Sequence, residues 1–426
     1  DVLTNISSEL RQSYEDDKGS RQQWEEAYTK GLDLLGLNYN ERSQPFQGAS
    51  GVTHPLLAES VTQFQAQAYK ELLPASGPVR AQVIGLATKE KEDQAQRVAE
   101  FMNYQMMHVM EEYDPELDQM LFYLPLSGST FKKVYYDSNL GRAVSKFVPS
   151  EDLVVPYSAT NLEECERVTH VLKRTENDIK KMQVTGFYRD IPLQPSEEDQ
   201  NKVEEKERKL SGIEKNAYKD DQYTLLEMHV DLDIEGFEHP DGIKLPYIVT
   251  IDEGSSEVLS IYRNYSQEDS LYKKQQYFVH YKFMPGLGFY GLGLIHMIGG
   301  LSRTATAALR QLIDAGTLAN LPAGFKARGL RVADDDQPIQ PGEFRDVDAP
   351  SGDLRAGLLP LPYKGADPTL FQLLGFCVQA GKEFATVADQ KLGDAANAGA
   401  PVGTTMALME RGMRVMSAIH KRMHYA

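Results

Sequence analysis

Cysteine and positive charge are scarce in this chain of 426 residues. The only two cysteines, Cys165 and Cys377, lie far apart and outside any Cys-x-x-Cys pair, so neither a disulfide framework nor a thiolate metal site is implied. A reducing cytoplasmic origin is the default. Lys and Arg total 45 against 62 for Asp and Glu, which gives a net charge of −17. That balance argues against tight, sequence-reading DNA binding, because affinity for DNA rises with each phosphate that a cation neutralises. It does not argue against DNA passing through.

One long stretch lacks charge altogether. Phe283 to Ser302 contains no Asp, Glu, Lys or Arg and reaches the length of a membrane span. It also contains six glycines, Pro285 and His296, which suit a membrane helix poorly. A membrane-inserting pore is therefore the third of three hypotheses for the function of this chain. No secretory signal begins the sequence. We expect both ends to be trimmed, since an initial Met is missing and the sequence stops inside a helical pattern.

Motifs that would support catalysis are absent or incomplete. No Gly-x-Ser-x-Gly elbow occurs. The stretch from Gly375 to Lys382 misses the P-loop spacing by one residue and places Glu383 where Ser or Thr must reach magnesium. His420 and His424 lie four apart on a helix, but the Glu of a zinc helix is not between them. We therefore expect no catalytic residue, no metal and no cofactor.

A glycine motif suggests one candidate function, the binding of a dinucleotide. Gly286, Gly288 and Gly291 satisfy G-x-G-x-x-G between a predicted strand and a predicted helix, which is the context of a dinucleotide-binding loop. Pro285 and the bulky pair Phe289-Tyr290 crowd the turn, and no parallel strand ending in an acidic residue follows. A nucleotide-dependent oxidoreductase that uses the Gly286–Gly291 loop remains the alternative.

Hydrophobic periodicity predicts an α+β chain. The predicted helices are 22–35, 53–72, 89–112, 295–320, 368–389 and 406–425. The predicted strands, mainly antiparallel, are 131–137, 143–148, 168–173, 223–232, 247–252, 258–264 and 276–283. The charge-dense stretch 196–221 is most simply a solvated helix or a mobile excursion.

Several residues mark helix ends and buried faces. Thr53 is a plausible N-cap, and Thr175 with Asp178 opens a short helix. A buried stripe is expected at Leu57, Val61, Phe64, Ala68 and Leu72. A second stripe, rich in methionine and expected to be core, comprises Met102, Met106, Val109 and Met110.

The helix 295–320 carries small and apolar residues at a three-four spacing, which keeps one seam facing a partner helix. From Ile298 onward the seam comprises Leu301, Ala305, Ala308, Leu312, Ala315 and Ala319. Arg303, Arg310 and Asp314 lie away from it. This pattern suits a ring of identical helices around a channel, and a buried helix within one domain predicts it equally well.

Several strings of this sequence resemble the portal proteins of tailed bacteriophages. The resemblance covers most of the chain and rests on the strings 46–50 (FQGAS), 52–59 (VTHPLLAE), 288–293 (GFYGLG), 309–317 (LRQLIDAGT), 341–347 (PGEFRDV) and 401–405 (PVGTT). It implies a portal fold in which an α/β wing, two stem helices flanking a small clip, a tunnel loop and a long helix towards a crown follow one another. The implied bounds are wing 1–294, stem helix 295–320, clip 321–367, stem helix 368–390, tunnel loop 391–402 and crown-directed helix 403–426, with crown and barrel absent.

The resemblance also implies a function and partners. A portal protein is a non-enzymatic ring, a homododecamer, at a unique capsid vertex through which viral double-stranded DNA is packaged, retained and ejected. The implied partners are other copies of the chain, the major capsid protein, the large subunit of the terminase (the packaging ATPase), tail adaptor proteins and non-specific double-stranded DNA, without a membrane. The implied location is the virion, after assembly in the cytoplasm of the host bacterium.

Three groups of site residues follow from the resemblance. Stem packing would involve Leu301, Ala305, Ala308 and Leu312. The DNA-tunnel loop would present Lys391, Asp394 and Asn397, which composition alone assigns equally well to an exposed linker. Docking of the packaging ATPase or tail adaptor at the clip would involve Lys326, Arg328 and Arg331, and solvated surface is the simpler interpretation of each of these residues taken alone.

Overall fold

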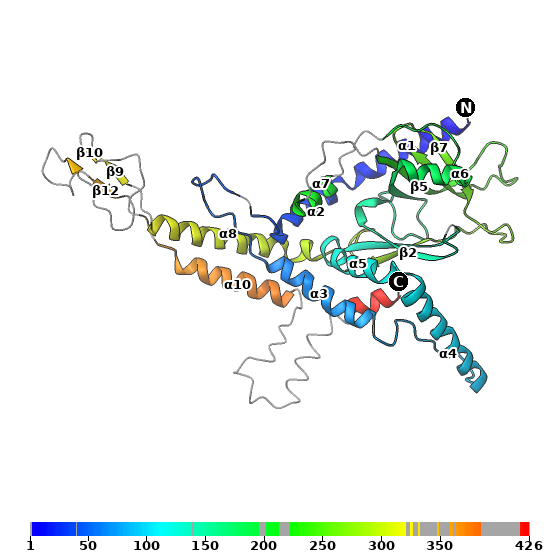
Figure 1. The fold of residues 1–426 in the computed structure, drawn as a ribbon, viewed down its shortest axis with the longest axis horizontal. Coiled ribbons are helices and arrows are strands. Elements are labelled where there is room, and N and C mark those ends of the chain that lie inside the picture. Colours follow the sequence, from blue (N-terminus) through cyan, green and yellow to red (C-terminus); the bar gives the residue numbers. More distant parts are fainter. Residues whose placement is uncertain are drawn as a thin grey trace. The chain divides into compact units, whose positions relative to one another are not determined.

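The chain divides into two compact units. The computed structural model describes residues 2–39, 41–138, 140–195, 202–212, 222–320, 363, 365–384 and 418–425, together with the backbone of four short strands between residues 324 and 360. Unit 1 comprises Asp1–Leu37, Pro55–Gly300 and Gly381–Ala426. Unit 2 comprises Asn38–His54 and Leu301–Ala380. Both contain helices and strands, so the chain has the expected α+β composition (Figure 1).

Unit 1 begins with a helical layer. Its elements are α1 (Val2–Ser20), α2 (Gln22–Leu32), η1 (Asp33–Leu35), α3 (Leu56–Leu72), α4 (Lys89–Tyr104), the π-helical turn η2 (Gln105–Val109) and α5 (Tyr113–Ser127). The apolar faces of α2, α3 and α5 form the largest core cluster of the described residues. The stripe that the sequence predicts on α3, from Leu57 to Leu72, is buried in this cluster and is thereby confirmed.

Two antiparallel sheets complete the body of unit 1. The first has the order β2-β1-β8, formed by β1 (Ser129–Asp137), β2 (Arg142–Val148) and β8 (Phe278–Lys282). The second has the order β3-β4-β5-β6-β7, formed by β3 (Leu153–Val154), β4 (Arg167–Thr175), β5 (Gln222–Leu232), β6 (Leu245–Asp252) and β7 (Val258–Arg263). Every strand pair among the described residues is antiparallel, as the turn residues between the predicted strands indicate.

Two helices cover opposite faces of the five-stranded sheet. Leu226 of β5 packs with Leu10 and Tyr14 of α1. The adjacent residue, Leu225, packs with Ile179 of α6 (Glu176–Val184). Since successive side chains of a strand point to opposite faces, α1 and α6 lie on the two sides of the sheet. The predicted cap of α6 is confirmed, because the Thr175 side chain accepts a hydrogen bond from the Asp178 amide.

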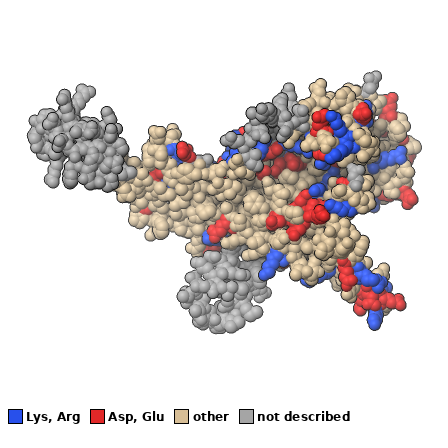
Figure 2. All heavy atoms as spheres, in the orientation of Figure 1, with Lys and Arg blue, Asp and Glu red and all other residues tan. Residues whose placement is uncertain are grey.

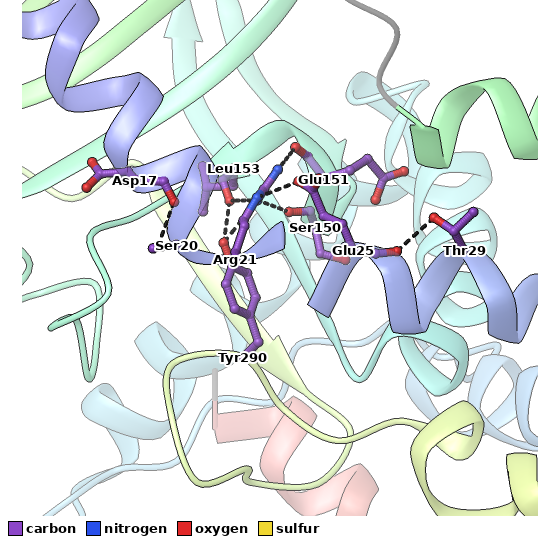
Figure 3. A network of polar contacts seen from close by, with 9 residues as sticks. All are labelled: Asp17, Ser20, Arg21, Glu25, Thr29, Ser150, Glu151, Leu153 and Tyr290. Carbon is purple, nitrogen blue, oxygen red and sulfur yellow. Dashed lines mark hydrogen bonds and ion pairs between the residues drawn. The ribbon is translucent and has the colours of Figure 1, made fainter. Parts of the chain in front are cut away.

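Arg21 lies between α1 and α2 and ties them to the loop before β3. Only 6% of its surface is exposed. Figure 3 shows the acceptors of its guanidinium group, which are the carbonyl oxygens of Ser150 (2.9 Å), Leu153 (2.9 Å) and Glu151, the hydroxyl of Tyr290 (3.0 Å) and the carboxylate of Glu25 (2.8 Å). A buried cation without such acceptors would be strongly destabilising, so these contacts fix the junction in one arrangement.

Two stretches of backbone meet closely at three glycines. Gly128 ends α5 with φ +84°, and a Cβ atom there or on Gly291 or Gly293 would overlap the other stretch. A Cβ on Gly291, for example, would also lie 2.7 Å from the carbonyl oxygen of Met284. The Gly291 amide donates to Ser129 Oγ at 2.7 Å. The connection from β8 to α8 (Leu294–Asn320) is thereby held against the end of α5.

The expected burial of the methionine-rich stripe is wrong. α4 has no buried residue: Phe101 is 62% and Met102 is 44% exposed. Met106, Val109 and Met110, which continue the stripe, are only half-buried. The helical period is correct, but periodicity does not specify which surface, if any, covers an apolar stripe.

The charge-dense stretch contains a helix that is only partly solvated. α7 (Lys202–Leu210) places Val203 completely inside the main core cluster. Its Lys206 Nζ lies 2.5 Å from Asp33 Oδ1. The remaining residues of the stretch, 196–201 and 213–221, lie outside the described residues.

Unit 2 contains most of α8 and α10 (Pro368–Phe384). Two small antiparallel pairs, β12-β9 and β10-β11, occur in the sequence between these helices. Their bounds are β9 (Gly324–Lys326), β10 (Arg331–Val332), β11 (Val347–Asp348) and β12 (Leu358–Pro360). The helix predicted at 295–320 is confirmed as α8. The predicted helix 368–389 is confirmed as far as Phe384, and of the helix predicted at 406–425 the described part, 418–425, is helical.

The expected cap at Thr53 is wrong. α3 begins at Leu56 after Pro55 and has no side-chain cap. The Thr53 hydroxyl oxygen instead accepts a hydrogen bond from Arg310 at 3.2 Å. A residue type that often caps helices is here used in a contact between distant parts of the sequence.

The glycine contact generates the first prediction. Gly291→Ala should lower the free energy of unfolding by about 1 to 3 kcal/mol, because the new methyl group has no space between two carbonyl oxygens. Gly288→Ala is the matched control in the same loop, since a Cβ at Gly288 meets nothing within 4 Å. Chemical denaturation of both variants measures the difference, and equal stabilities would contradict the proposed cause.

Candidate functional site

The residues of the seam predicted on α8 differ in how deeply they are buried. Ala305 is fully buried and Ala308 is 4% exposed, whereas Leu301 and Leu312 are half-buried. These four residues are the ones that the resemblance assigns to stem packing. Their packing against helices of other copies remains a prediction.

Arg310 binds the loop that precedes α3. Its Nε donates to the carbonyl oxygen of Val52 at 2.7 Å, and its Nη2 donates to Thr53 Oγ1 at 3.2 Å. The same nitrogen reaches the carbonyl oxygen of Gly51 at 3.4 Å. One side chain of α8 thus provides donors to three consecutive residues of the loop, 51–53, which form no β-bridge among the described residues.

Asp314, one turn further along α8, binds the same loop. Its Oδ1 accepts a hydrogen bond from the Ser50 amide at 2.7 Å, and its Oδ2 lies 3.7 Å from Arg42 Nη1. Asp314 is only 7% exposed. One turn before Arg310, Thr306 Oγ1 accepts from the His54 amide at 3.1 Å. We call Thr306, Arg310 and Asp314 with the loop 42–54 the α8 clamp.

The clamp gives these charged residues a role that the sequence did not predict. Arg310 and Asp314 lie away from the apolar seam, as expected, and they bind the chain's own loop. Burial, followed by the charge of Arg42, lowers the pKa of Arg310, and Asp314 acts in the opposite direction. The spacing of four between Arg310 and Asp314 was visible in the sequence, but their acceptors and donors lie more than 250 residues away. No local sequence pattern connects these α8 residues with their partners in the loop.

The other candidate residues are placed only in part. Lys326 lies on β9 and Arg331 on β10, where the structure describes the backbone alone. Arg328, Lys391, Asp394 and Asn397 lie outside the described residues. The proposed roles of the clip and tunnel-loop residues therefore remain predictions.

The glycine motif has a structural explanation that requires no nucleotide. The strand before it, β8, pairs antiparallel with β1, whereas a dinucleotide fold needs parallel strands joined by a crossover helix. Gly291 permits the close backbone contact with Gly128. The approximate P-loop, Gly375 to Lys382, lies within the helix α10 and forms no loop.

Neither a metal site nor a membrane helix is found in the described part of the chain. His420, which the sequence pairs with His424, contacts the carboxylate of Glu71 instead of a metal, and no group of three metal-ligating side chains occurs among the described residues. None of the described helices combines the length and apolar character needed to cross a bilayer. The charge-free stretch from Phe283 to Ser302 begins directly after β8 and is divided between a loop and the first part of α8.

A buried ionic cluster joins the two sheets of unit 1. Lys133 Nζ on β1 lies 2.5 and 2.6 Å from the carboxylate oxygens of Glu227 on β5, and His229 Nε2 lies 2.9 Å from Glu227 Oε1. Burial would raise the pKa of Glu227, but Lys133 and His229 together hold it below its ordinary value. Burial lowers the pKa of His170 beside them to about 3. A carboxylate that stays ionised and an imidazole that stays neutral at pH 7 suit a structural tie better than proton transfer.

Comparison with known proteins identifies the class of protein. Residues 132–422 match the model of a family described as phage SU10 portal protein, and this match spans more than half of the chain. The chain therefore belongs to this family of phage portal proteins. A search of curated proteins found no match. The family match begins within β1 and ends in the helical segment 418–425, so it includes both sheets, α8 and α10.

The α8 clamp generates the second prediction. Asp314→Ala should lower the free energy of unfolding of unit 2 by about 1 to 3 kcal/mol, because it leaves the buried Ser50 amide without an acceptor. Arg303→Ala changes an exposed residue of the same helix and should have an effect within about 0.5 kcal/mol. Hydrogen exchange of the Ser50 amide, compared between the two variants, provides a local measurement. Unchanged protection of Ser50 in Asp314→Ala would exclude the clamp as its source.

Proposed function

We propose that copies of this chain close into a ring-shaped channel at a unique capsid vertex, through which viral double-stranded DNA is packaged, retained and ejected. Membership of the portal family supports this function. The ring is a dodecamer in the proposed form and has no enzymatic activity of its own. A separate packaging ATPase supplies the force, and contacts with DNA are weak and independent of sequence.

The observation that carries the proposal is the exposed apolar surface of α10. Phe371 is 70%, Phe376 is 67% and Leu373 is 43% exposed, although all three lie on a helix whose Cys377 is buried. Full burial of one such side chain contributes about 1.5 to 3 kcal/mol. Large aromatic residues that stay in water on a short helical stretch are typical of a surface that another protein covers.

The placement of these residues favours a ring over a pair. Phe371 and Phe376 are five positions apart, so they point about 140° away from each other around the helix axis. Two different flanks of α10 are therefore apolar and exposed. A closed ring gives every copy one neighbour on each flank, whereas a two-fold pair buries the same patch of both copies once.

The surface charge is consistent with this arrangement. In Figure 2, few charged side chains lie over α8 and α10, whereas Lys, Arg, Asp and Glu are intermixed over the sheets of unit 1. Charge-poor helical surface is suited to burial between copies. The small residues of the α8 seam would contribute to the same packing, with Leu301 and Leu312 still half-exposed to receive a neighbour.

We assign the parts of a portal to this chain as the resemblance implies. The wing is 1–294, the stem helices are 295–320 and 368–390, the clip is 321–367, the tunnel loop is 391–402 and the crown-directed helix is 403–426. The separation of Leu301–Ala380 into unit 2 supports a stem and clip that are distinct from the wing. Asn38–His54 belongs to the proposed wing sequence but clusters with unit 2 through the α8 clamp.

The clip is the proposed docking place of the large terminase subunit and, later, of the tail adaptor proteins. Lys326, Arg328 and Arg331 provide three cations within a short stretch for an acidic partner. The major capsid protein would surround the ring in the virion. These partners and the vertex location are inferred from the family.

The tunnel loop is supported by how its two flanks are anchored. Before it, Lys382 Nζ pairs with Glu59 at 2.8 Å, and after it His420 pairs with Glu71, both on α3. Arg422 donates to the carbonyl oxygen of Phe283 at 2.7 Å. Glu59 and Glu71 are about 18 Å apart along α3, so the two ends of the proposed tunnel loop are both attached to one helix. We propose that Lys391, Asp394 and Asn397 in that loop contact the DNA.

Assembly provides the third prediction. Phe371→Asp and Phe376→Asp should each weaken the association of copies at least tenfold, because burying a carboxylate in an apolar contact costs well over 1.4 kcal/mol. Mass measurement in solution across a range of protein concentrations detects the change. Gln372→Asp adds the same charge at an exposed polar position of α10 and should matter less. A wild-type chain that stays monomeric throughout would refute the ring.

The tunnel loop provides the fourth prediction. Deletion of Gly393 to Gly399 should leave ring assembly intact, since the anchors on α3 remain, while packaging or retention of DNA falls. The DNA content of assembled particles and its loss with time are the measurements. A replacement of the same length by Gly and Ser separates the effect of length from that of Asp394 and Asn397. Normal packaging and retention by the deletion variant would reject the tunnel assignment.

A further inference from the structure

Three carboxyl groups meet where α7 packs on the core of unit 1. Glu207 belongs to α7, and Glu151 and Asp152 belong to η3 (Ser150–Asp152) at the start of the five-stranded sheet. Glu151 is 6% exposed, and the other two are half-buried. The three are close enough for their charges to act on one another.

The hydrogen bonds around this cluster are incomplete. Tyr123 of α5 donates its hydroxyl proton to Glu207 Oε2 at 3.2 Å. Glu151 Oε2 and the hydroxyl of the fully buried Tyr28 have no hydrogen-bond partner among the described residues. A buried carboxylate oxygen without a partner is strongly disfavoured in its ionised form.

The cations nearby are already engaged with other groups. Lys206 pairs with Asp33, Lys173 pairs with Glu204, and Arg21 binds backbone carbonyls and Glu25. The titratable and charged groups that act on the cluster are Tyr28 of α2, Tyr123 of α5, Lys173 of β4, Glu204 of α7 and Arg21. Three carboxyl groups therefore lack a full set of counter-charges.

We propose that a shared proton stabilises the docking of α7: the cluster of Glu151, Asp152 and Glu207 keeps a proton while α7 is docked, and loss of this proton at higher pH weakens the docking of the helix. The geometry points to Glu207 as the residue that couples the proton to α7, because it alone of the three is on the moving element. Val203 and the Lys206–Asp33 pair also hold the helix, so the proton adds to the docking without being its sole cause.

The direction of the pH effect follows from linkage. Burial, together with the charges of Asp152 and Glu204, raises the pKa of Glu207 from 4.5 to about 7. Burial also raises the pKa of Asp152 to about 6 and that of Glu151 above its ordinary value. The docked state thus binds more protons than the undocked state. Docking is strongest at low pH and weakens as the pH rises through about 7.

Hydrogen exchange of the full chain tests this fifth prediction. The protection factors of the amides of α7, corrected for intrinsic exchange at each pH, should fall roughly tenfold between pH 6 and 8.5, the ratio given by one carboxyl group with pKa values of 4.5 undocked and about 7 docked. Glu207→Gln keeps an acceptor for Tyr123 and should abolish most of this fall. Glu151→Gln, which changes the cluster from η3, should also reduce it.

A variant on the outer face of the same helix is the control. Glu205 pairs with Lys209 on the surface, so Glu205→Gln should leave the pH dependence as in the wild type. Protection that is equal at pH 6 and 8.5, or a fall that persists in Glu207→Gln, would overturn the proposal. The outcome is independent of ring assembly, because the cluster and its partners all lie within unit 1.

Discussion

At Gly128, Gly291 and Gly293 two stretches of backbone touch without any side chain between them. One stretch ends α5 and begins β1, and the other leads from β8 into α8. The helical core, the three-stranded sheet and the start of the long helix are therefore positioned by one contact. Ser129 extends it, because its hydroxyl oxygen receives the Gly291 amide and lies 3.0 Å from His280 on β8. Any side chain at these glycines would force the sheet and the helical core apart.

Unit 2 is organised by polar contacts instead. The loop 42–54 offers amides and carbonyl groups that need partners, and α8 provides them from three successive turns through Thr306, Arg310 and Asp314. Hydrogen bonds of this kind contribute about 1 kcal/mol each but specify one register, since a shift of the loop by one residue would leave buried groups unpaired. The strings that resemble portal proteins, FQGAS and LRQLIDAGT, are the two sides of this clamp. In this chain the two strings are therefore joined to each other by a hydrogen bond between their own residues.

Periodicity predicted the strands and the long helices because each depends on a local pattern that a single stretch of sequence contains. The burial of β1 alternates from Lys133 on, and the buried residues of α3 repeat every three or four positions; both elements occur where the sequence predicts a strand and a helix. The failures involve distant partners. Thr53 resembles a cap but binds Arg310, and Met102 resembles core but is 44% exposed. The helices α1 and α5 escaped prediction, the first because it is largely polar and the second because it contains Pro125. Of the candidate site, the seam on α8 follows from spacing, whereas the partner of Asp314 is 264 residues away and no local rule reaches it.

The placement of charge explains how an acidic protein suits the proposed passage of DNA. Internal ion pairs such as Asp17 with Arg167 and Glu227 with Lys133 each contain one negative and one positive group. They therefore contribute nothing to the net charge of the chain. The excess of 17 negative charges must therefore belong to the groups outside such pairs. Double-stranded DNA carries a negative charge for about every 1.7 Å of its axis, and it binds proteins mainly by exchanging counterions for Lys and Arg. In the proposed channel, an excess of acidic groups would offer no such exchange. The duplex would then bind weakly and slide past, and its retention would depend on a few local contacts that can be released.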